Sequence, residues 1–311
     1  MKKKLLTGCA ALMLVLVGVV LFAFTSIAIP ARSHYSVDMT EVRRLAREGD
    51  GELATELNSI RVVTSHVPGL FVTSDRGFKQ HTFLTYSYQV VYADRTVMVD
   101  AVTDHATAEA ILPGSTEWPG SYDRMQLGLR QASSVVFTHE HFDHCSGIAT
   151  SPYLDEITDR VHFTREQIPR LGLPKPESSG FTPEVVAKLK PLAYEGLHKL
   201  APGMVLFKAP SHTPGSQMIY IVLGSGEEFL LVGDIAWHMD NITKPQQHPR
   251  FISWLSGEEK EQHVHVLRWL HDLNRANPEL HIVVGHDGDQ MDGYVAAGLI
   301  GADLEIKNGS D

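Results

Sequence analysis

The hydrophobic pattern divides the chain into an uncharged N-terminal run and a longer region of short alternating elements. Apolar residues run from Leu5 to Ile29 without a charge, directly after three lysines. About 20 such residues can span a bilayer as a helix, so we expect a membrane anchor over residues 5–29. The basic end favours the cytoplasm, which would place the rest of the chain outside it. A cleaved signal peptide is the alternative, because Ser26-Ile27-Ala28 offers a small-residue cleavage site and would leave the protein secreted or periplasmic.

From residue 31 onward, the pattern predicts one mixed α/β domain. Apolar runs between turn residues predict strands, at 60–64, 82–92, 96–100, 134–138, 204–208, 217–223, 228–233 and 280–284. Stripes of helical period predict helices, at 38–49, 123–132 and 256–278. Two of these helices begin with the spacing of a capping box, at Asp38 with Glu41 and at Ser256 with Glu259.

The sequence also indicates where loops lie and how the chain divides into segments. Residues 104–122 are expected to be rich in loops, and the prolines of 151–182 indicate a broken surface excursion. We therefore divide the chain into residues 1–30 (anchor or signal), 31–59 (linker and helix) and 60–311 (the main domain). The helix of the middle segment would either pack on the main domain or space it from the membrane.

Composition narrows the classes of protein that remain. The 311 residues are 43% hydrophobic and 21% charged, which is ordinary for a globular chain and excludes a disordered one. The net charge of −10 disfavours nucleic acid as a partner, since such binders usually carry a basic surplus. The two cysteines are too few for a disulfide scaffold or a cysteine-rich zinc site, whereas 17 histidines are many. Cys9 and Cys145 lie in different parts of the chain, so we expect no bond between them.

The strongest chemical signal is His139-Glu140-His141-Phe142-Asp143-His144, directly after a predicted buried strand. Side chains two apart in an extended segment point to the same side, so His139 and His141 can reach one metal ion. Asp143 and His144 follow where the chain must turn and can face a second ion. Imidazole and carboxylate suit zinc, manganese or iron. The motif therefore predicts a metal site rather than a histidine-rich surface loop.

Three more candidate ligands each follow a predicted strand: His212, Asp234 and His286. Each is weak evidence alone, because a single His or Asp in a loop is usually structural. With the first motif they make seven candidate ligands, which is enough for two metal ions with open positions.

These seven residues, in this order, resemble the motifs of the metallo-β-lactamase superfamily over about residues 60–300. The resemblance implies an αββα sandwich with two metal ions in a groove at one edge of the two sheets. We expect two divalent ions, with zinc ahead of manganese or iron. It implies that His139, His141 and His212 hold the first metal. It implies further that Asp143, His144 and His286 hold the second, and that Asp234 bridges both.

This chain differs from several individual families of the superfamily, and these differences limit which of them it can resemble in detail. Main-type zinc β-lactamases place Cys where this chain has Asp234, and flavodiiron proteins place Glu where it has His141. Glyoxalase II-type enzymes add a C-terminal domain, whereas only 25 residues follow His286 here. Acyl-homoserine lactone lactonases share the bridging Asp but commonly carry Tyr three residues later, where this chain has Trp237.

The expected activity is that of a binuclear metal-dependent hydrolase acting on a small molecule. Two cations lower the pKa of a shared water, so that a metal-bound hydroxide attacks an ester, lactone or thioester. Asp143 and Asp234 would anchor and orient that hydroxide as the catalytic residues. The alternatives are a phosphodiesterase of the same fold and a mononuclear iron oxygenase resembling persulfide dioxygenases.

The sequence says less about the other aromatic, histidine and cysteine residues that stand out. Trp118, Phe142, Trp237 and His238 could line the groove, although aromatic residues in loops more often pack locally. Three histidines of the last long helix, His263, His265 and His271, are expected to be packed or solvated. Cys145 is expected to be a small buried residue behind the motif.

Overall fold

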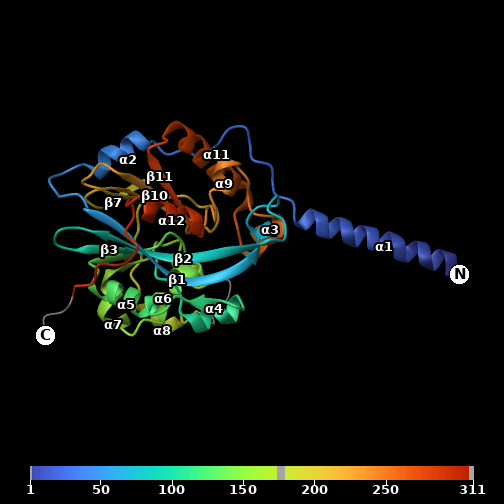
Figure 1. The fold of residues 1–311 in the computed structure, drawn as a ribbon, viewed down its shortest axis with the longest axis horizontal. Helices are drawn as coiled ribbons and strands as arrows, with labels where there is room; N and C mark the ends of the chain where they lie inside the picture. Colours follow the sequence, from blue (N-terminus) through green and yellow to red (C-terminus); the bar gives the residue numbers. More distant parts are fainter. Residues whose placement is uncertain (1, 174–178, 308–311) are drawn as a thin grey trace.

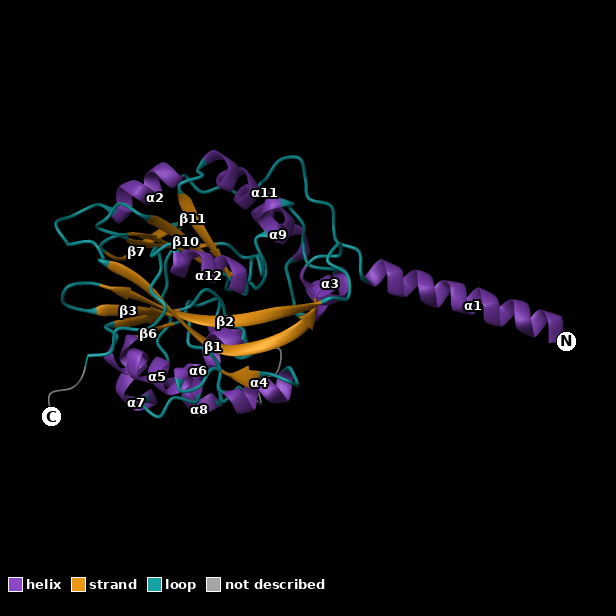
Figure 2. Ribbon diagram, viewed as in Figure 1, coloured by secondary structure: helices purple, strands orange, loops and turns teal. Residues whose placement is uncertain are grey.

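Two mixed β-sheets lie face to face, and helices cover the outer side of each (Figures 1 and 2). The computed structural model describes residues 2–173 and 179–307, and side chains from residue 12 onward and at Cys9. The four-layered α/β arrangement agrees with the fold that the sequence predicts.

The first sheet has six strands in the order β4-β1-β2-β3-β5-β6. Its members are β1 (Glu56–Pro68), β2 (Gln80–Val91), β3 (Thr96–Val99), β4 (Thr116–Glu117), β5 (Ser134–Val136) and β6 (Val161–His162). The pairs from β4 to β3 are antiparallel, whereas β3, β5 and β6 run parallel. The carboxyl ends of β3 and β5 therefore meet at one edge of this sheet.

The second sheet has five strands in the order β11-β10-β9-β8-β7. Its members are β7 (Leu197–Ala201), β8 (Met204–Lys208), β9 (Gln217–Val222), β10 (Glu228–Gly233) and β11 (Leu280–Val284). Because β9 is antiparallel to both β8 and β10, and β11 is parallel to β10, strands β8, β10 and β11 point the same way. Their carboxyl ends also lie at one edge.

The helices fall into two outer layers and a few short connections. Over the first sheet lie α4 (His105–Ile111), α5 (Ser121–Gln131), α6 (Phe142–Ala149), α7 (Leu154–Ile157) and α8 (Pro183–Lys188). Over the second lie α2 (Met39–Ala46), α9 (Asp240–Thr243) and α11 (Lys260–Ala276). The others are α1 (Lys2–Ala23), α3 (Gly69–Val72), α10 (Arg250–Leu255), α12 (Gly288–Ala296) and the 3-10 turns Thr158–Arg160 and Ile168–Arg170.

Three buried clusters hold these layers together. The cluster between the sheets joins Tyr86 and Val90 of β2 to Leu206, Ile219 and Phe229 of the second sheet. A second cluster packs α2 and α11 on the outer face of the second sheet, and a third packs α5 and α6 on the first. The helix of residues 38–49 therefore packs on the main domain and does not act as a spacer.

Most predicted strands are confirmed to within a few residues, and the Gly224-Ser225-Gly226 turn joins antiparallel β9 and β10. The second capping box is wrong. Helix α11 begins at Lys260, and Ser256 instead ends the short helix α10, where its N–H donates to Ile252 O. The stretch 104–122 also contains α4, which Asp104 caps by accepting a bond from the N–H of Thr107.

The N-terminal apolar run differs from its prediction. Helix α1 points away from the rest of the chain and ends at Ala23 (Figure 1). Thr25 O accepts a bond from the N–H of Arg250, and Ser26 donates to Gln247 O, so these residues bind the main domain instead of extending the helix to residue 29.

Within the described part of the chain, no helix is both long and apolar enough to cross a membrane. The predicted anchor and signal are therefore not supported. Part of that prediction, at residues 5–8, 10 and 11, lies outside the described side chains. The location of the main domain outside the cytoplasm stays a prediction.

The layer between the sheets gives a direct test of the fold. Ile219 of β9 is fully buried there, so Ile219→Ala should lower the free energy of unfolding by about 2–5 kcal/mol, through lost burial and a residual cavity. Urea denaturation followed by circular dichroism measures this. Lys190→Ala, which removes an exposed ion pair with Asp159, is the control and should leave the midpoint unchanged. Equal effects of the two substitutions would contradict this placement of Ile219.

Candidate metal centre

Strand ends bring the predicted site residues together at one edge of the sandwich. His139, His141 and helix α6 follow β5, while His212, Asp234 and His286 follow β8, β10 and β11. The two edges are joined directly, because the N–H of Gln217 donates to Thr138 O at 2.9 Å. All seven predicted residues form two adjoining groups that share Asp234.

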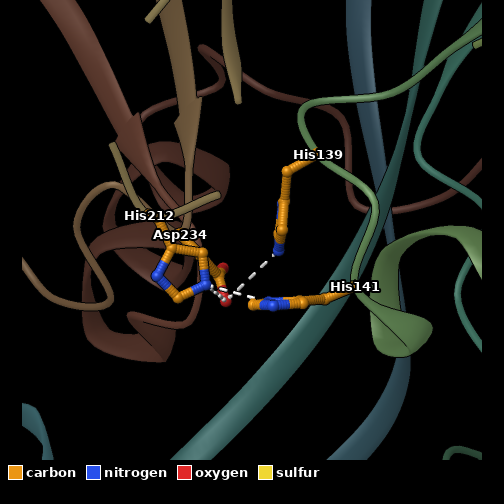
Figure 3. A group of neighbouring side chains, drawn as sticks. All are labelled: His139, His141, His212 and Asp234. Carbon is orange, nitrogen blue, oxygen red and sulfur yellow. Dashed lines mark hydrogen bonds and ion pairs between the residues drawn. The ribbon is translucent and has the colours of Figure 1, made fainter. Parts of the chain in front are cut away.

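The first group consists of His139, His141, His212 and Asp234 (Figure 3). Its side chains converge on one point from loops of the two sheets. Asp234 Oδ2 lies 3.7 Å from His139 Nε2 and 3.6 Å from His212 Nε2. His212 Nε2 lies 2.9 Å from His141 Nδ1.

The second group consists of Asp143, His144, His286 and Asp234. Asp234 Oδ1 lies 3.1 Å from His144 Nε2 and 2.9 Å from His286 Nε2. Asp143 Oδ2 is 3.7 Å from the Nε2 atoms of both histidines. The two oxygens of Asp234 thus face different groups, which is the geometry that a bridging carboxylate needs.

Two glycines allow the close approach of these loops. Gly233 has a φ of +51°, and a Cβ there would lie 2.6 Å from Thr138 Oγ1. A Cβ on Gly285 would lie 2.3 Å from Asp234 Oδ1. Both positions precede a site residue, so a side chain at either would push Asp234 or its neighbours out of place.

In the first group, the outer nitrogen of each imidazole faces an acceptor. His212 Nδ1 lies 3.1 Å from the carboxylate of Glu258, and His141 Nε2 lies 3.1 Å from the carbonyl of Ser256. His139 Nδ1 is 3.1 Å from Thr138 Oγ1, whose own hydrogen goes to Asp100 Oδ2. An acceptor requires the proton on the nitrogen that faces it, so all three rings turn a lone pair toward the centre.

The second group is oriented in the same way. His144 Nδ1 lies 2.8 Å from Asp100 Oδ2, and His286 Nδ1 donates to Leu84 O at 2.8 Å. With a proton on each Nδ1, the two Nε2 atoms, which lie 3.5 Å apart, are the ring atoms left to hold a cation. Such partners on the far nitrogen are the usual means of holding a metal-binding histidine.

This arrangement fits metal ions, because lone pairs that face one another repel unless a cation lies between them. His141 Nδ1 and His212 Nε2 are such a pair, and His139 Nε2 is buried without a hydrogen-bond partner. The ligand atoms of each group lie within 4.8 Å of one another. The histidine and aspartate clusters thus have the composition and geometry of a binuclear metal site.

The pKa shifts show how strongly the centre depends on charge. Burial lowers the pKa of His139 and brings that of His141 to about 3, so both rings are neutral. Burial would also lower the pKa of His144, but Asp234, Asp143 and Asp100 outweigh it and raise that pKa. The three carboxylates around His144 thus favour positive charge at this position.

Asp100 and Glu258 are the important residues that sequence reasoning missed. Asp100 follows β3, has a φ of +61° and accepts bonds that orient both His139, through Thr138, and His144. The only sequence feature that could have indicated Asp100 is its place as an acidic residue at the end of the predicted strand 96–100. Glu258 lies in the loop before α11 and had no recognisable pattern.

The four residues predicted to line the groove lie in different places in the structure. Trp237 lies at the centre, where its Nε1 donates to Asp234 Oδ2 at 2.9 Å. His238 contacts Arg76 and Asp287. Phe142 is buried, while Trp118 lies under the Arg61 guanidinium and lines a separate cavity that none of the seven residues borders. Substrate contact stays a prediction for each.

The residues predicted to be structural are packed. His263 is buried, His265 stacks on His34, and His271 donates to Ile242 O. Cys145 is buried behind the motif with Sγ 3.3 Å from Glu140 O, and burial raises the pKa of its thiol well above the usual value.

A larger cavity of about 510 Å³ lies beside the second group. None of the seven residues lines it, but Leu84, whose carbonyl accepts a bond from His286, and Asp287, which follows His286, do. Its lining carries three cations and three carboxylates: Arg61, Arg76, Lys79, Asp287, Asp289 and Asp292. Space for a small molecule therefore adjoins the site without a strong preference for either sign of charge.

Solved structures with this fold include quorum-quenching enzymes. An N-acyl homoserine lactone lactonase matches with a TM-score of 0.61 and 18% identity, over 78% of this chain and 97% of its own. An N-acyl homoserine lactone hydrolase with the product N-hexanoyl-L-homoserine at its catalytic metal centre matches with a TM-score of 0.60 and 17% identity. The match covers 78% of this chain and 96% of the hydrolase. A probable metal-dependent hydrolase from Staphylococcus aureus matches with a TM-score of 0.54 and 12% identity, over 75% of this chain and 90% of its own. At these identities the likeness shows the fold.

Sequence comparison identifies the family. None of the curated proteins compared with this chain matches it. The sequence profile of the metallo-beta-lactamase superfamily, however, matches residues 82–288, a range that runs from β2 to the start of α12 and includes all seven residues of the two groups. The chain therefore belongs to the metallo-beta-lactamase superfamily.

Proposed function

We propose that this metal-dependent hydrolase uses two divalent cations to cleave a carboxylic ester, lactone or thioester. The observation that carries the proposal is the position of Asp234, whose two oxygens face separate sets of histidines. When bound, two such cations lower the pKa of a water toward neutrality and polarise the carbonyl oxygen of the substrate.

The side chains of the centre have distinct parts in this chemistry. Neutral His139 and His141 keep their lone pairs available at ordinary pH, because burial lowers their pKa values. Asp234 offsets positive charge between the two groups. Asp143 is the most exposed of the carboxylates at the centre, with 13% of its side chain accessible. It can accept a hydrogen bond from the attacking water.

The substrate class is supported by several separate features. Solved structures that share the fold of this chain include enzymes named for lactone hydrolysis. The balanced charges around the 510 Å³ cavity do not favour a polyanionic substrate, so a phosphodiester is the weaker candidate. Cys145 is buried, and its raised pKa keeps the thiol protonated. A covalent thiol mechanism therefore has no support.

Trp237 makes acyl-homoserine lactones a poor choice as the specific substrate. Its N–H donates to Asp234 Oδ2, and an indole is a donor only. A tyrosine at this position could also release or accept a proton through its hydroxyl. We therefore propose the ester, lactone and thioester class and no single member of it.

Replacing Asp234 tests the bridging role. Asp234→Asn keeps the size of the side chain but removes its charge, so we expect loss of bound metal and a fall in kcat of about 100-fold or more. Metal content by mass spectrometry and kcat on the best substrate measure these effects. Asp292→Asn, which changes a carboxylate at the cavity rim that pairs with Arg61, is the matched control and should bind two metals. If Asp234→Asn still bound two metals and kept a near-normal kcat, the proposed bridging role of Asp234 would be wrong.

Metal removal tests the proposed activity itself. Chelation of the full chain should abolish hydrolysis, and zinc, manganese or cobalt should restore it, because ligand sets of His and Asp accept all three. Aryl esters, lactones, thioesters and phosphodiesters form the substrate panel. Full hydrolysis by exhaustively metal-free protein would rule the proposal out. One iron per chain together with oxygen consumption would favour the oxygenase alternative.

A further inference from the structure

A short loop between α10 and α11 supports two of the three histidines of the first group. Ser256 O accepts from His141 Nε2, and the carboxylate of Glu258 accepts from His212 Nδ1. The N–H of Glu259 donates to Ser211 O at 2.8 Å, which ties this loop to the loop of His212. The loop therefore contacts the first group and has no contact of this kind with the second.

Glu258 is the central residue of this loop. Its side chain is fully buried. One oxygen lies 3.1 Å from His212 Nδ1 and 2.5 Å from His248 Nδ1, and the other lies 3.1 Å from His263 Nδ1 and 3.3 Å from Gln247 Nε2. Four nitrogens thus surround one fully buried carboxylate.

A positive charge on His263 balances this buried carboxylate. His263 Nε2 lies 2.8 Å from the carbonyl of Ile235, while its Nδ1 faces Glu258. Both ring nitrogens face acceptors, so both carry protons and the ring is an imidazolium. Glu258 therefore remains charged and turns only acceptor atoms toward His212.

We propose that Glu258 is a positioning residue that sets the affinity of the first metal position through His212. This inference rests on the binuclear function proposed above. The carboxylate fixes the proton of His212 on Nδ1, which leaves Nε2 free to bind a cation, and it makes the ring a stronger donor to that cation. The second group does not touch Glu258, since Asp100 and Leu84 hold its histidines.

His212, His248 and Glu258 could in principle hold a third metal ion, since they form a compact group of their own. Their distances of 2.5 and 3.1 Å are those of hydrogen bonds between a donor and an acceptor. His212 would also need to lose its remaining proton. The cluster is therefore a support for the first group.

Chelator competition on the full chain tests the proposal with Glu258→Gln, which keeps the shape of the side chain and removes its charge. We expect zinc to bind in two steps, with the first-position affinity reduced about 10- to 100-fold in this variant and the second unchanged. His212→Ala and His286→Ala identify which step belongs to which group. The ligand-field spectrum of the cobalt-loaded variant should change in the bands that His212→Ala removes.

Glu228→Gln is the matched control. Glu228 lies at the opposite end of the strand that leads to Asp234 and pairs with Arg43 at 2.8 Å, so the variant loses a largely buried carboxylate that touches no candidate ligand. It should leave both zinc affinities at their original values. Unchanged zinc affinities and cobalt spectrum in Glu258→Gln would overturn the inference. Absence of metal binding in the unsubstituted chain would instead overturn the binuclear function.

A measurement on the unsubstituted protein covers the case in which Glu258→Gln fails to fold. Histidine side-chain NMR of the zinc-loaded chain should show a proton on His212 Nδ1 that is protected from exchange, and no proton on Nε2. A His212 ring protonated on Nε2, or an Nδ1 proton that exchanges freely with solvent, would overturn the role of Glu258.

Discussion

The structure depends on one electrostatic constraint: five imidazole rings and two carboxylates meet in a buried place at the edge of the sheets. Each histidine is fixed by an acceptor on its far side, so none can turn its lone pair away from the centre. The facing lone pairs of His141 and His212 repel each other, and Asp143 repels Asp234. Cations relieve both kinds of repulsion, and for this reason the centre is best understood as a binding site that the fold prepares in advance.

Much of the fold could be predicted from the sequence because its core strands are continuous apolar runs. Strands β8 and β11 have the bounds that the pattern predicts, since they are buried on both faces. Helix α6 was missed because its sequence, Phe142–Ala149, carries candidate ligands and has no long apolar stripe. Helix α12 was missed for a similar reason, as it is short, polar and contains two glycines.

The site was predictable for a different reason. Ligands that follow strands need no knowledge of long-range packing, because parallel strands place their carboxyl ends at one edge. This explains why His212, Asp234 and His286 could be joined to the first motif although more than 140 residues separate His139 from His286. The supporting residues obey no such rule. Glu258 reaches His212 only because α11 packs on the second sheet and the loop before it is bonded to the loop of His212. Leu84 acts through a carbonyl that every residue has.

The two metal positions differ in what holds them, and this difference bears on how the centre works. The second group is held by Asp100 at a strand end and by the backbone of β2, both parts of the first sheet. The first group is held partly by a loop beyond the sheets, at Ser256 and Glu258. Rigid strands vary little in position, whereas loops can adjust or be altered by substitution. Asp234 faces both groups, so a change at His212 would also act on the second group through this carboxylate. The loop before α11 can thus change the chemistry of the whole centre while contacting only one half of it.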